Sequence, residues 1–248
     1  MEWEKVTDTI CNFIERYIKE SNADGVVVGL SGGVDSSTVA FLCVRALGKE
    51  RVLGLVMPEV GITAEEDIRD AIDIAERLGI EYKTVEINEI VNLFKEKLGE
   101  GGKLAEANLK PRIRMIINYY HANRMNRLVA GTGNKSELMI GYFTKYGDGG
   151  VDFLPIGDLY KTEVLELARY LGVPEKIIRK KPTAGLWIGQ TDEDEIGMSY
   201  TELDKILEAI EKGEKRNDEK FERVRYLIRI SKHKREMPPV AKVRELLE

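Results

Sequence analysis

Short apolar segments alternate with longer helical patterns through the first half of the chain, and this alternation limits the fold most strongly. Apolar runs of strand length lie at 26–30, 51–58, 80–87 and 127–133, and helical patterns lie between them. Strands separated by helices are typical of a parallel sheet with helices on both faces. We therefore predict an α/β fold of the Rossmann-like kind, in which ligands bind beyond the carboxyl ends of the strands.

Capping signals mark several of the expected helices. The helices are predicted at 3–20, 63–78, 88–98, 105–126, 199–210 and 218–230. Thr63 with Glu66 and Ser199 with Glu202 have the spacing of a capping box, in which the first side chain accepts from the backbone of the second residue. No linker or repeat interrupts the sequence, so we expect residues 1–248 to form a single domain.

The stretch VVVGLSGGVDSSTVAF, residues 26–41, predicts a strand, a glycine turn and a helix. The turn has neither the Lys-Ser/Thr pair of a Walker-type loop nor the three glycines of a dinucleotide fingerprint. Its glycines let backbone amides point into one concavity, to which a helix start adds unpaired N–H groups. Such a turn suits phosphate, and Ser31, Ser36 and Ser37 carry hydroxyls that can donate to it. Asp35 would repel an anion unless a divalent cation lies between them, which indicates magnesium. The alternative is an ordinary strand-to-helix turn.

Charge and cysteine content exclude some classes of partner. Lys and Arg total 38 against 43 Asp and Glu, a net charge of -5, so we expect no nucleic-acid partner. No apolar stretch approaches membrane-spanning length and no signal-peptide pattern is seen, so we expect a cytoplasmic protein without a membrane partner. Cys11 and Cys43 lie on apolar helical faces, which indicates buried thiols in a reducing compartment.

The glycine turn and several later motifs resemble those of one enzyme family. SGGVDSS is similar to the pyrophosphatase loop of enzymes that cleave ATP between its α and β phosphates. Further segments occur in the same order in NAD synthetases: NLKPRIRM (108–115), GTGNKSE (131–137), and the segments 142–164, 181–197 and 231–238. This resemblance covers nearly the whole chain, and it implies an adenine nucleotide alpha hydrolase-like version of the parallel-sheet fold.

The resemblance implies a ligase that forms a C–N bond in two steps. The nicotinate carboxylate of deamido-NAD attacks the α-phosphorus of ATP and releases pyrophosphate, and ammonia then displaces AMP to form NAD. The glutamine-dependent relatives carry an added amidase domain, for which these residues leave no room, so the ammonia-dependent form is expected. ATP as co-substrate, Mg²⁺ and a homodimer are further implications.

The family's functional residues map onto this sequence motif by motif. Asp35 and Glu137 match the metal ligands, and with Lys161 they form the expected catalytic set. The expected ATP contacts are Gly29, Leu30, Ser31, Gly32, Gly33, Val34, Asp35, Ser36, Thr132, Lys161 and Thr183. The expected deamido-NAD contacts are Arg112, Lys145, Asp152, His233 and Lys234. Thr183 replaces a serine found in many relatives and keeps the hydroxyl.

Other interpretations remain open for individual residues and for the function. The acidic run 191–195 is interpreted as a short capped helix without a ligand role. Trp187 can stack on a base or anchor its loop. Rival functions are another ATP pyrophosphatase, such as a GMP synthetase-like domain or a tRNA-thiolating enzyme, and a nucleotide-binding regulator of the universal-stress type. Release of AMP and pyrophosphate with deamido-NAD and ammonia would favour the synthetase.

Overall fold

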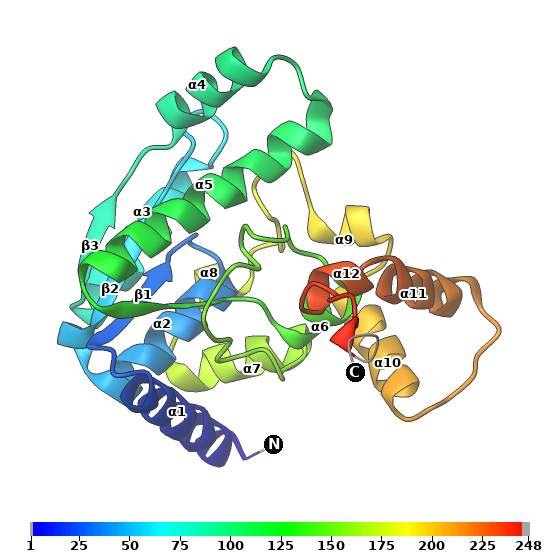
Figure 1. Cartoon of the computed structure of the whole chain (residues 1–248). Coiled ribbons are helices and arrows are strands. Elements are labelled where there is room, and N and C mark those ends of the chain that lie inside the picture. The colour runs from blue at the N-terminus through cyan, green and yellow to red at the C-terminus, as the bar shows by residue number, and fades with distance from the viewer. Residues whose placement is uncertain (1, 245–248) are drawn as a thin grey trace.

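The computed structural model describes residues 2–244, which form a parallel sheet covered by helices on both faces (Figure 1). The strands are β1 (Gly25–Gly29), β2 (Val52–Val56), β3 (Glu81–Thr84) and β4 (Arg127–Ala130). The helices are α1 (Trp3–Glu20), α2 (Val34–Leu47), the 3₁₀ turn η1 (Lys49–Arg51), α3 (Glu65–Leu78), α4 (Asn88–Leu98), α5 (Gly102–Arg124), α6 (Lys135–Ile140), α7 (Lys161–Leu171), α8 (Glu175–Ile178), α9 (Asp192–Ile196), α10 (Tyr200–Glu211), α11 (Glu219–Ile230) and α12 (Lys232–Arg235). The predicted α/β class is confirmed.

In the strand order β3-β2-β1-β4, successive strands are first added on one side of β1 and then on the other, so the strand order reverses between β1 and β4. All pairs are parallel, and Val27 of β1 lies level with Leu53 of β2 and Val129 of β4. The chain proceeds from β1 through β2 to β3 and then returns to the other side of β1. In open parallel sheets, ligands bind beyond the carboxyl ends of the strands at such a reversal. The turns after β1 and β4 therefore meet at the expected ligand position.

Two hydrophobic cores lie on opposite faces of the sheet because side chains alternate along each strand. Val26 and Val28 pack with α1, α2, α3 and α7, whereas Val27 and Leu53 pack with α4 and α5. Strands covered on both faces need apolar residues at successive positions, which explains the run VVV in β1. A third core joins α6, α9, α10 and α11, which lie to the right of the strands in Figure 1.

Several element boundaries differ from the expectation. The capping box predicted at Thr63 and Glu66 is wrong: Ala64 precedes α3 without a side-chain cap, and the Thr63 hydroxyl accepts from the backbone N–H of Glu59. The hydroxyl therefore stabilises the loop after β2 and is not available to the helix. The box of Ser199 and Glu202 is confirmed at α10. The third predicted strand shrinks to four residues, since β3 is an edge strand paired only with β2.

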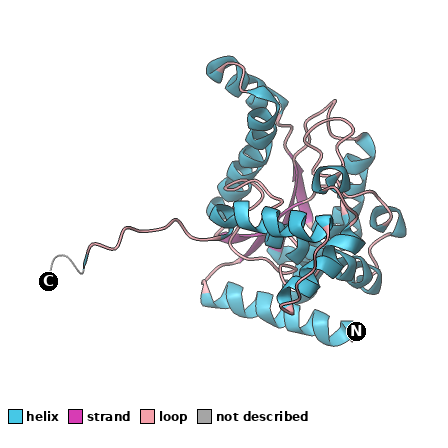
Figure 2. Ribbon diagram, turned by 90° about the vertical axis from the view of Figure 1, so that its right-hand side faces the viewer, coloured by secondary structure: helices cyan, strands magenta, loops and turns pink. Residues whose placement is uncertain are grey.

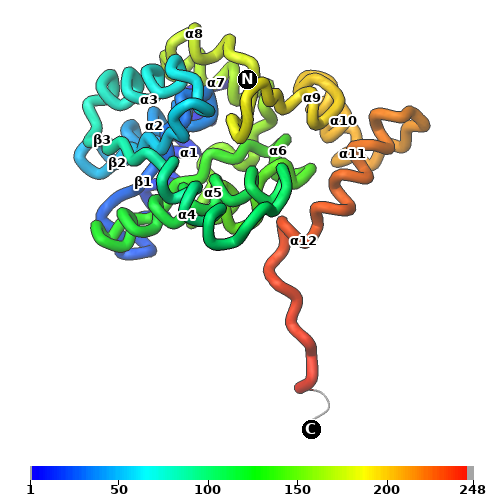
Figure 3. The backbone as a smooth tube through the Cα atoms, turned by 90° about the horizontal axis from the view of Figure 1, so that it is seen from above, coloured from blue at the N-terminus to red at the C-terminus, as the bar shows by residue number. Residues whose placement is uncertain are grey.

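The segment after α12 leaves the body of the molecule. Residues 236–244 run outward as an extended chain (Figures 2 and 3), with Met237 and Val240 almost fully exposed. Among residues 2–244, no helix is both long and apolar enough to cross a membrane.

Candidate active site at the carboxyl ends of β1 and β4

The turn after β1 has the backbone shape that its glycines predict. Gly32 has a φ of +77°, and a Cβ at this position would lie 2.1 Å from the carbonyl oxygen of Asp67. Only glycine fits there. The Ser36 hydroxyl accepts from the N–H of Ser31 at 3.2 Å and donates to the carbonyl of Gly33 at 3.1 Å, which closes the turn on itself. The hydroxyl of Ser37, expected to face phosphate, is buried and donates to the Gly33 carbonyl at 2.8 Å instead.

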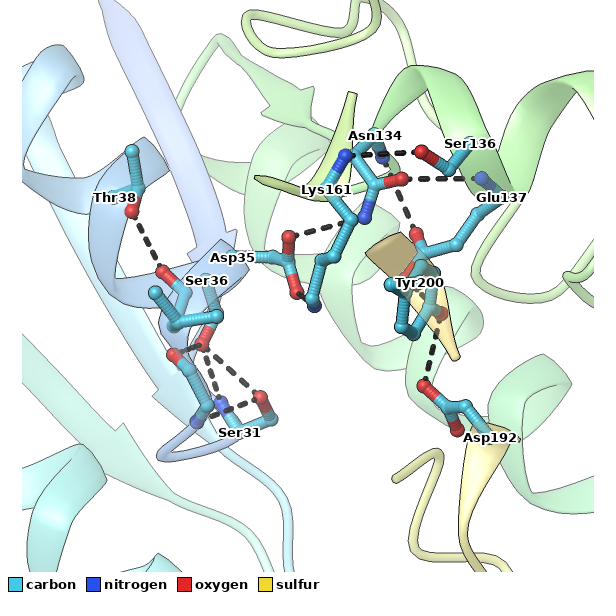
Figure 4. Close-up of polar contacts among 12 residues, drawn as sticks. Ser31, Asp35, Ser36, Thr38, Asn134, Ser136, Glu137, Lys161, Asp192 and Tyr200 are labelled. Carbon is cyan, nitrogen blue, oxygen red and sulfur yellow. Dashed lines mark hydrogen bonds and ion pairs between the residues drawn. The ribbon is translucent and has the colours of Figure 1, made fainter. Parts of the chain in front are cut away.

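The two predicted metal ligands are held together by one asparagine (Figure 4). Asp35 lies in the first turn of α2, and Glu137 lies in the first turn of α6. Asn134, which is fully buried, donates from Nδ2 to Asp35 at 3.1 Å and accepts at Oδ1 from the N–H of Glu137 at 3.1 Å. The Glu137 carboxylate accepts in return from the N–H of Asn134 at 3.2 Å. A capping box at the start of α6 thus joins the β1 side of the site to the β4 side.

Lys161 is brought to the same place by the start of α7. Its side chain is 3% exposed, and Nζ forms an ion pair with Asp35. The N–H of Lys161 donates to the Ser136 hydroxyl at 2.9 Å, and the N–H of Thr162 donates to Asp204 at 2.9 Å. Since Ser136 also donates to Asp204, a carboxylate from α10 and a hydroxyl from α6 satisfy the first N–H groups of α7. The helix start is thereby fixed, and with it the lysine.

Negative charge accumulates around Glu137. Burial and the neighbouring charge of Asp35 raise the pKa of Glu137 to about 8. Asp192 is also buried, and burial raises its pKa although Lys161 is near. The Tyr200 hydroxyl lies 3.1 Å from Asp192 and 3.4 Å from Glu137, and its ring lies 5.3 Å from Lys161 Nζ. Burial and nearby carboxylates thus raise the pKa of two neighbouring acids at this point of the site.

Two cavities meet at this cluster. The larger, of about 790 Å³, runs from the glycine turn past β2 to the loop 181–190. The smaller, of about 500 Å³, lies between α6 and the loop 148–157. Both are lined by Thr132, Glu137, Phe143, Asp148 and Lys234. Molecules bound in the two cavities would therefore approach each other beside Glu137.

Most of the expected ATP contacts line the larger cavity. They are Gly29, Leu30, Ser31, Gly33, Val34, Asp35, Ser36, Thr132, Lys161 and Thr183. Gly32 is buried beneath them against α3. The Thr183 hydroxyl accepts from the N–H of Gly185 at 3.0 Å within an exposed loop. Lys103 Nζ lies 4.0 Å from the centre of the Trp187 ring, so one face of that ring meets a cation from α5.

Four of the five expected deamido-NAD residues come together from three distant segments. The guanidinium of Arg112 donates to the carbonyl of Lys145 at 3.3 Å, and Lys145 Nζ donates to the carbonyl of His233. Lys234 Nζ donates to the carbonyls of Gly141 and Phe143, at 2.9 and 2.8 Å.

Asp152 lies apart from them. Its carboxylate accepts from the Tyr119 hydroxyl at 3.0 Å and from the N–H of Val129 at 2.7 Å, and it lines neither cavity. The structure thus gives Asp152 partners beside β4, and its contact with a ribose hydroxyl stays a prediction.

Sequence reasoning missed Asn134 and Asp192. The spacing of Asn134 and Glu137 is that of a capping box, so this signal was present in GTGNKSE. Thr191 does cap α9 as predicted. Asp192, however, is not a solvated acid of that helix: its carboxylate faces inward to Tyr142 and Tyr200. No local pattern distinguishes it from the acids beside it.

The chain matches known proteins in both sequence and fold. The NAD synthase family model matches residues 6–238. The NH(3)-dependent NAD(+) synthetase of Archaeoglobus fulgidus is 71% identical over 247 residues, which is 100% of both chains. Among solved structures, NMN synthetase from Francisella tularensis is 35% identical with a TM-score of 0.90 over 98% of this chain and 99% of that one. The NH3-dependent NAD synthetase from Campylobacter jejuni, solved with a nitrate ion, is 36% identical with a TM-score of 0.85 over 98% and 100%. With a match this extensive in sequence and fold, the chain belongs to the NAD synthase family.

Proposed function

We propose that this chain amidates deamido-NAD with ammonia at the expense of ATP, and that Asp35, Glu137 and Lys161 carry the reaction. The observation that supports these roles is the junction of the two cavities at Glu137. ATP would occupy the larger cavity with its phosphates on the glycine turn, and the acid substrate would enter by the smaller one. The carboxylate and the α-phosphorus would then meet beside Glu137.

The first step brings a carboxylate to a polyphosphate, so charge neutralisation is its main demand. A carboxylate oxygen of the nicotinate forms a bond to the α-phosphorus, and the bond to the bridging oxygen of pyrophosphate breaks. Lys161, already buried and charged beside Asp35, would stabilise negative charge on the departing phosphates. In the second step the nitrogen of ammonia bonds to the acyl carbon, the bond from that carbon to the phosphate oxygen of AMP breaks, and the nitrogen loses one proton to solvent to leave the amide.

Mg²⁺ fits the donors present at the site. Mg²⁺ is commonly held by one or two carboxylates together with substrate phosphates. Asp35 and Glu137 provide two carboxylates bridged by Asn134. Burial and the charge of Asp35 raise the pKa of Glu137, and a divalent cation would relieve both effects. When bound, Mg²⁺ would screen the phosphates and polarise their oxygens. Asp35 and Glu137 are the ligands we propose.

The deamido-NAD assignment relies on a chain of contacts that ends at the two cavities. Arg112 donates to the carbonyl of Lys145, Lys145 donates to the carbonyl of His233, and the next residue, Lys234, lines both cavities. The side chains of these four residues would meet the diphosphate or carboxylate of the dinucleotide. Asp152 is proposed to accept from a ribose hydroxyl. Thr132, Thr183 and the glycine turn are proposed as the ATP contacts.

We further propose a homodimer formed through α4 and α5. Large apolar side chains are exposed on these two helices: Leu93, Phe94, Leu98, Leu104, Ile116 and Tyr120. Exposed apolar surface of this extent is typical of interaction sites. Ile116→Lys should shift the protein from dimer to monomer in sedimentation velocity, whereas Tyr226→Lys on α11 should not. An unchanged dimer in the first variant would contradict this interface.

The chain is proposed to work as one domain, because one family model spans residues 6–238. The thiols of Cys11 and Cys43 are buried and free, which supports a reducing compartment such as the cytoplasm.

A turnover assay tests the proposed function. The purified protein is supplied with ATP, Mg²⁺ and either deamido-NAD or nicotinic acid mononucleotide, each with ammonium or with glutamine. We expect NAD, AMP and pyrophosphate in equal amounts with deamido-NAD and ammonium, and little product with glutamine. Amidation of the mononucleotide but not of deamido-NAD would overturn the dinucleotide assignment. Release of ADP would overturn the proposed cleavage of ATP.

A further inference from the structure

A cluster of two lysines and three acids lies directly behind the glycine turn. Asp70 of α3 is fully buried and is bonded by Lys176 of α8, at 2.5 Å, and by Lys180 just after α8. Lys180 also meets Asp67 at 2.7 Å, and Lys176 meets Asp73 at 2.9 Å. Asp70 thus joins two sets of ion pairs. We call Lys176 with Asp73 the Lys176 arm, and Lys180 with Asp67 the Lys180 arm.

The two arms differ in where they lead. The Lys176 side chain is 51% exposed and lines neither cavity, whereas that of Lys180 is 20% exposed and lines the larger cavity. Lys180 Nζ lies 3.4 Å from the carbonyl oxygen of Gly32, to which it donates. Only the Lys180 arm therefore contacts the turn that we assign to the phosphates.

The contact with Gly32 bears on the orientation of one peptide group. The carbonyl of Gly32 and the N–H of Gly33 belong to the same planar unit and point in opposite directions. On one side the carbonyl is held by Lys180, and on the other the N–H points to the Ser31 hydroxyl at 3.3 Å, on the cavity side. A peptide between two glycines rotates with little steric resistance, so an external contact is needed to fix it.

We infer that Lys180 is a positioning residue, which orients the Gly32–Gly33 peptide so that its N–H faces the pyrophosphate part of ATP. Asp67 and Asp70 hold the ammonium group in place, and the same lysine leads into the loop 181–190 that carries Thr183. Donors that are oriented before the ligand arrives bind anions more tightly, because no reorganisation is needed. This inference rests on the proposed function of the glycine turn as the phosphate site.

Matched variants on the two arms test the inference by calorimetric titration with magnesium pyrophosphate and, separately, with AMP. Lys180→Met should weaken pyrophosphate binding about tenfold, the effect of losing one hydrogen bond to a charged group. AMP binding should not change. Lys176 contacts Asp70, as Lys180 does, but it does not contact Gly32. Lys176→Met should therefore lower thermal stability and leave both affinities unchanged.

A second pair separates positioning from direct contact with phosphate. Asp67→Asn frees Lys180 from one acid, and Asp73→Asn is its counterpart on the Lys176 arm. If Lys180 acts through the turn, Asp67→Asn should weaken pyrophosphate binding severalfold and Asp73→Asn should not. If Lys180 instead binds phosphate directly, Asp67→Asn would leave or increase the affinity, which overturns the inference.

Two further outcomes are distinguishable. Equal losses in Lys176→Met and Lys180→Met would show only a structural cluster and overturn the inference. Failure of the unaltered protein to bind pyrophosphate would instead contradict the phosphate site itself. In steady-state assays, Lys180→Met should raise KM for ATP and leave KM for deamido-NAD unchanged, with partial recovery in Lys180→Arg.

Discussion

Glu137 and Asp70 are two carboxylates shielded by the same fold, yet their surroundings act on them in opposite ways. Burial and the nearby Asp35 raise the pKa of Glu137. Burial would also raise the pKa of Asp70, but the hydrogen bonds from Lys176 and Lys180 outweigh it and lower that pKa. The charge of Asp70 is matched by two lysines, whereas Glu137 has another carboxylate, Asp35, beside it. The difference favours a structural role for Asp70 and supports the ligand role proposed for Glu137.

The largest expected effect is on turnover after substitution of the two proposed metal ligands. Asp35→Asn and Glu137→Gln should each lower kcat roughly a hundredfold to a thousandfold, as removal of other electrostatic groups from active sites does. The fold should persist, because a glutamine oxygen can still accept from the N–H of Asn134. Pyrophosphate release at limiting magnesium is the measurement, with Asp158→Asn on the exposed surface as the control. Near-normal turnover in either variant would refute the shared metal site.

The matched acid should show the reverse pattern, with a larger effect on stability than on turnover. Asp70→Asn removes the charge that holds two lysines, and we expect a loss of about 2 to 3 kcal/mol in unfolding free energy. Urea titration of this variant beside Glu137→Gln makes the comparison direct. Equal stability of the two variants would remove the distinction between the acids.

A third test concerns the basic residues proposed to bind deamido-NAD. Arg112→Ala should weaken deamido-NAD binding about ten- to a hundredfold, the range for a charge-assisted contact, and change ATP binding much less. Arg112 is exposed and donates only to a backbone carbonyl, so its loss should spare the fold. Separate titrations with the two substrates decide. Equal losses of affinity for ATP and deamido-NAD would contradict a specific role of Arg112 in deamido-NAD binding.

The smallest expected effect is a pH dependence with opposite signs at the two acids. In protein without metal or nucleotide, Glu137 has a folded-state pKa above its ordinary value of 4.5, so its contribution to stability falls as pH rises from 4.5 through about 8. Asp70 has a lowered pKa, so its contribution is present above 3.8 and is lost as pH falls below that value. Unfolding titrations between pH 5 and 8.5 should therefore show the stability of Glu137→Gln rising relative to that of the unaltered protein as pH rises. A constant difference would contradict the raised pKa.

Local sequence patterns predicted the sheet, its helices and the place of the site. The glycine turn and the segment 131–137 each follow an apolar run, and parallel strands bring such turns to one edge of a sheet. That Asp35 and Glu137 meet there followed from this rule. The cap at α10 was equally readable, because Ser199 and Glu202 satisfy each other within one helical turn.

Contacts between distant segments could not be read in the same way. Lys180 reaches Gly32 across 148 positions, and Asp204 closes the start of α7 across 42. Neither pair has a signature in spacing or composition, since any lysine or aspartate on those helices would look alike. Thr63 shows the converse error. The spacing of Thr63 and Glu66 is that of a capping box, but in the fold the Thr63 hydroxyl accepts from the N–H of Glu59 in the preceding loop.

The reversal of strand order between β1 and β4 also governs when the site can exist during synthesis. The glycine turn is made early, but Glu137 follows it by about a hundred residues, and β4 can only join β1 after α4 and α5 have been built. Contacts so far apart in the chain form late, because the intervening segment must first be ordered. A nascent chain that ends near residue 126 contains three strands and the glycine turn, yet it has neither Glu137 nor Lys161. With the roles proposed for Asp35, Glu137 and Lys161, nucleotide turnover would require the completed sheet.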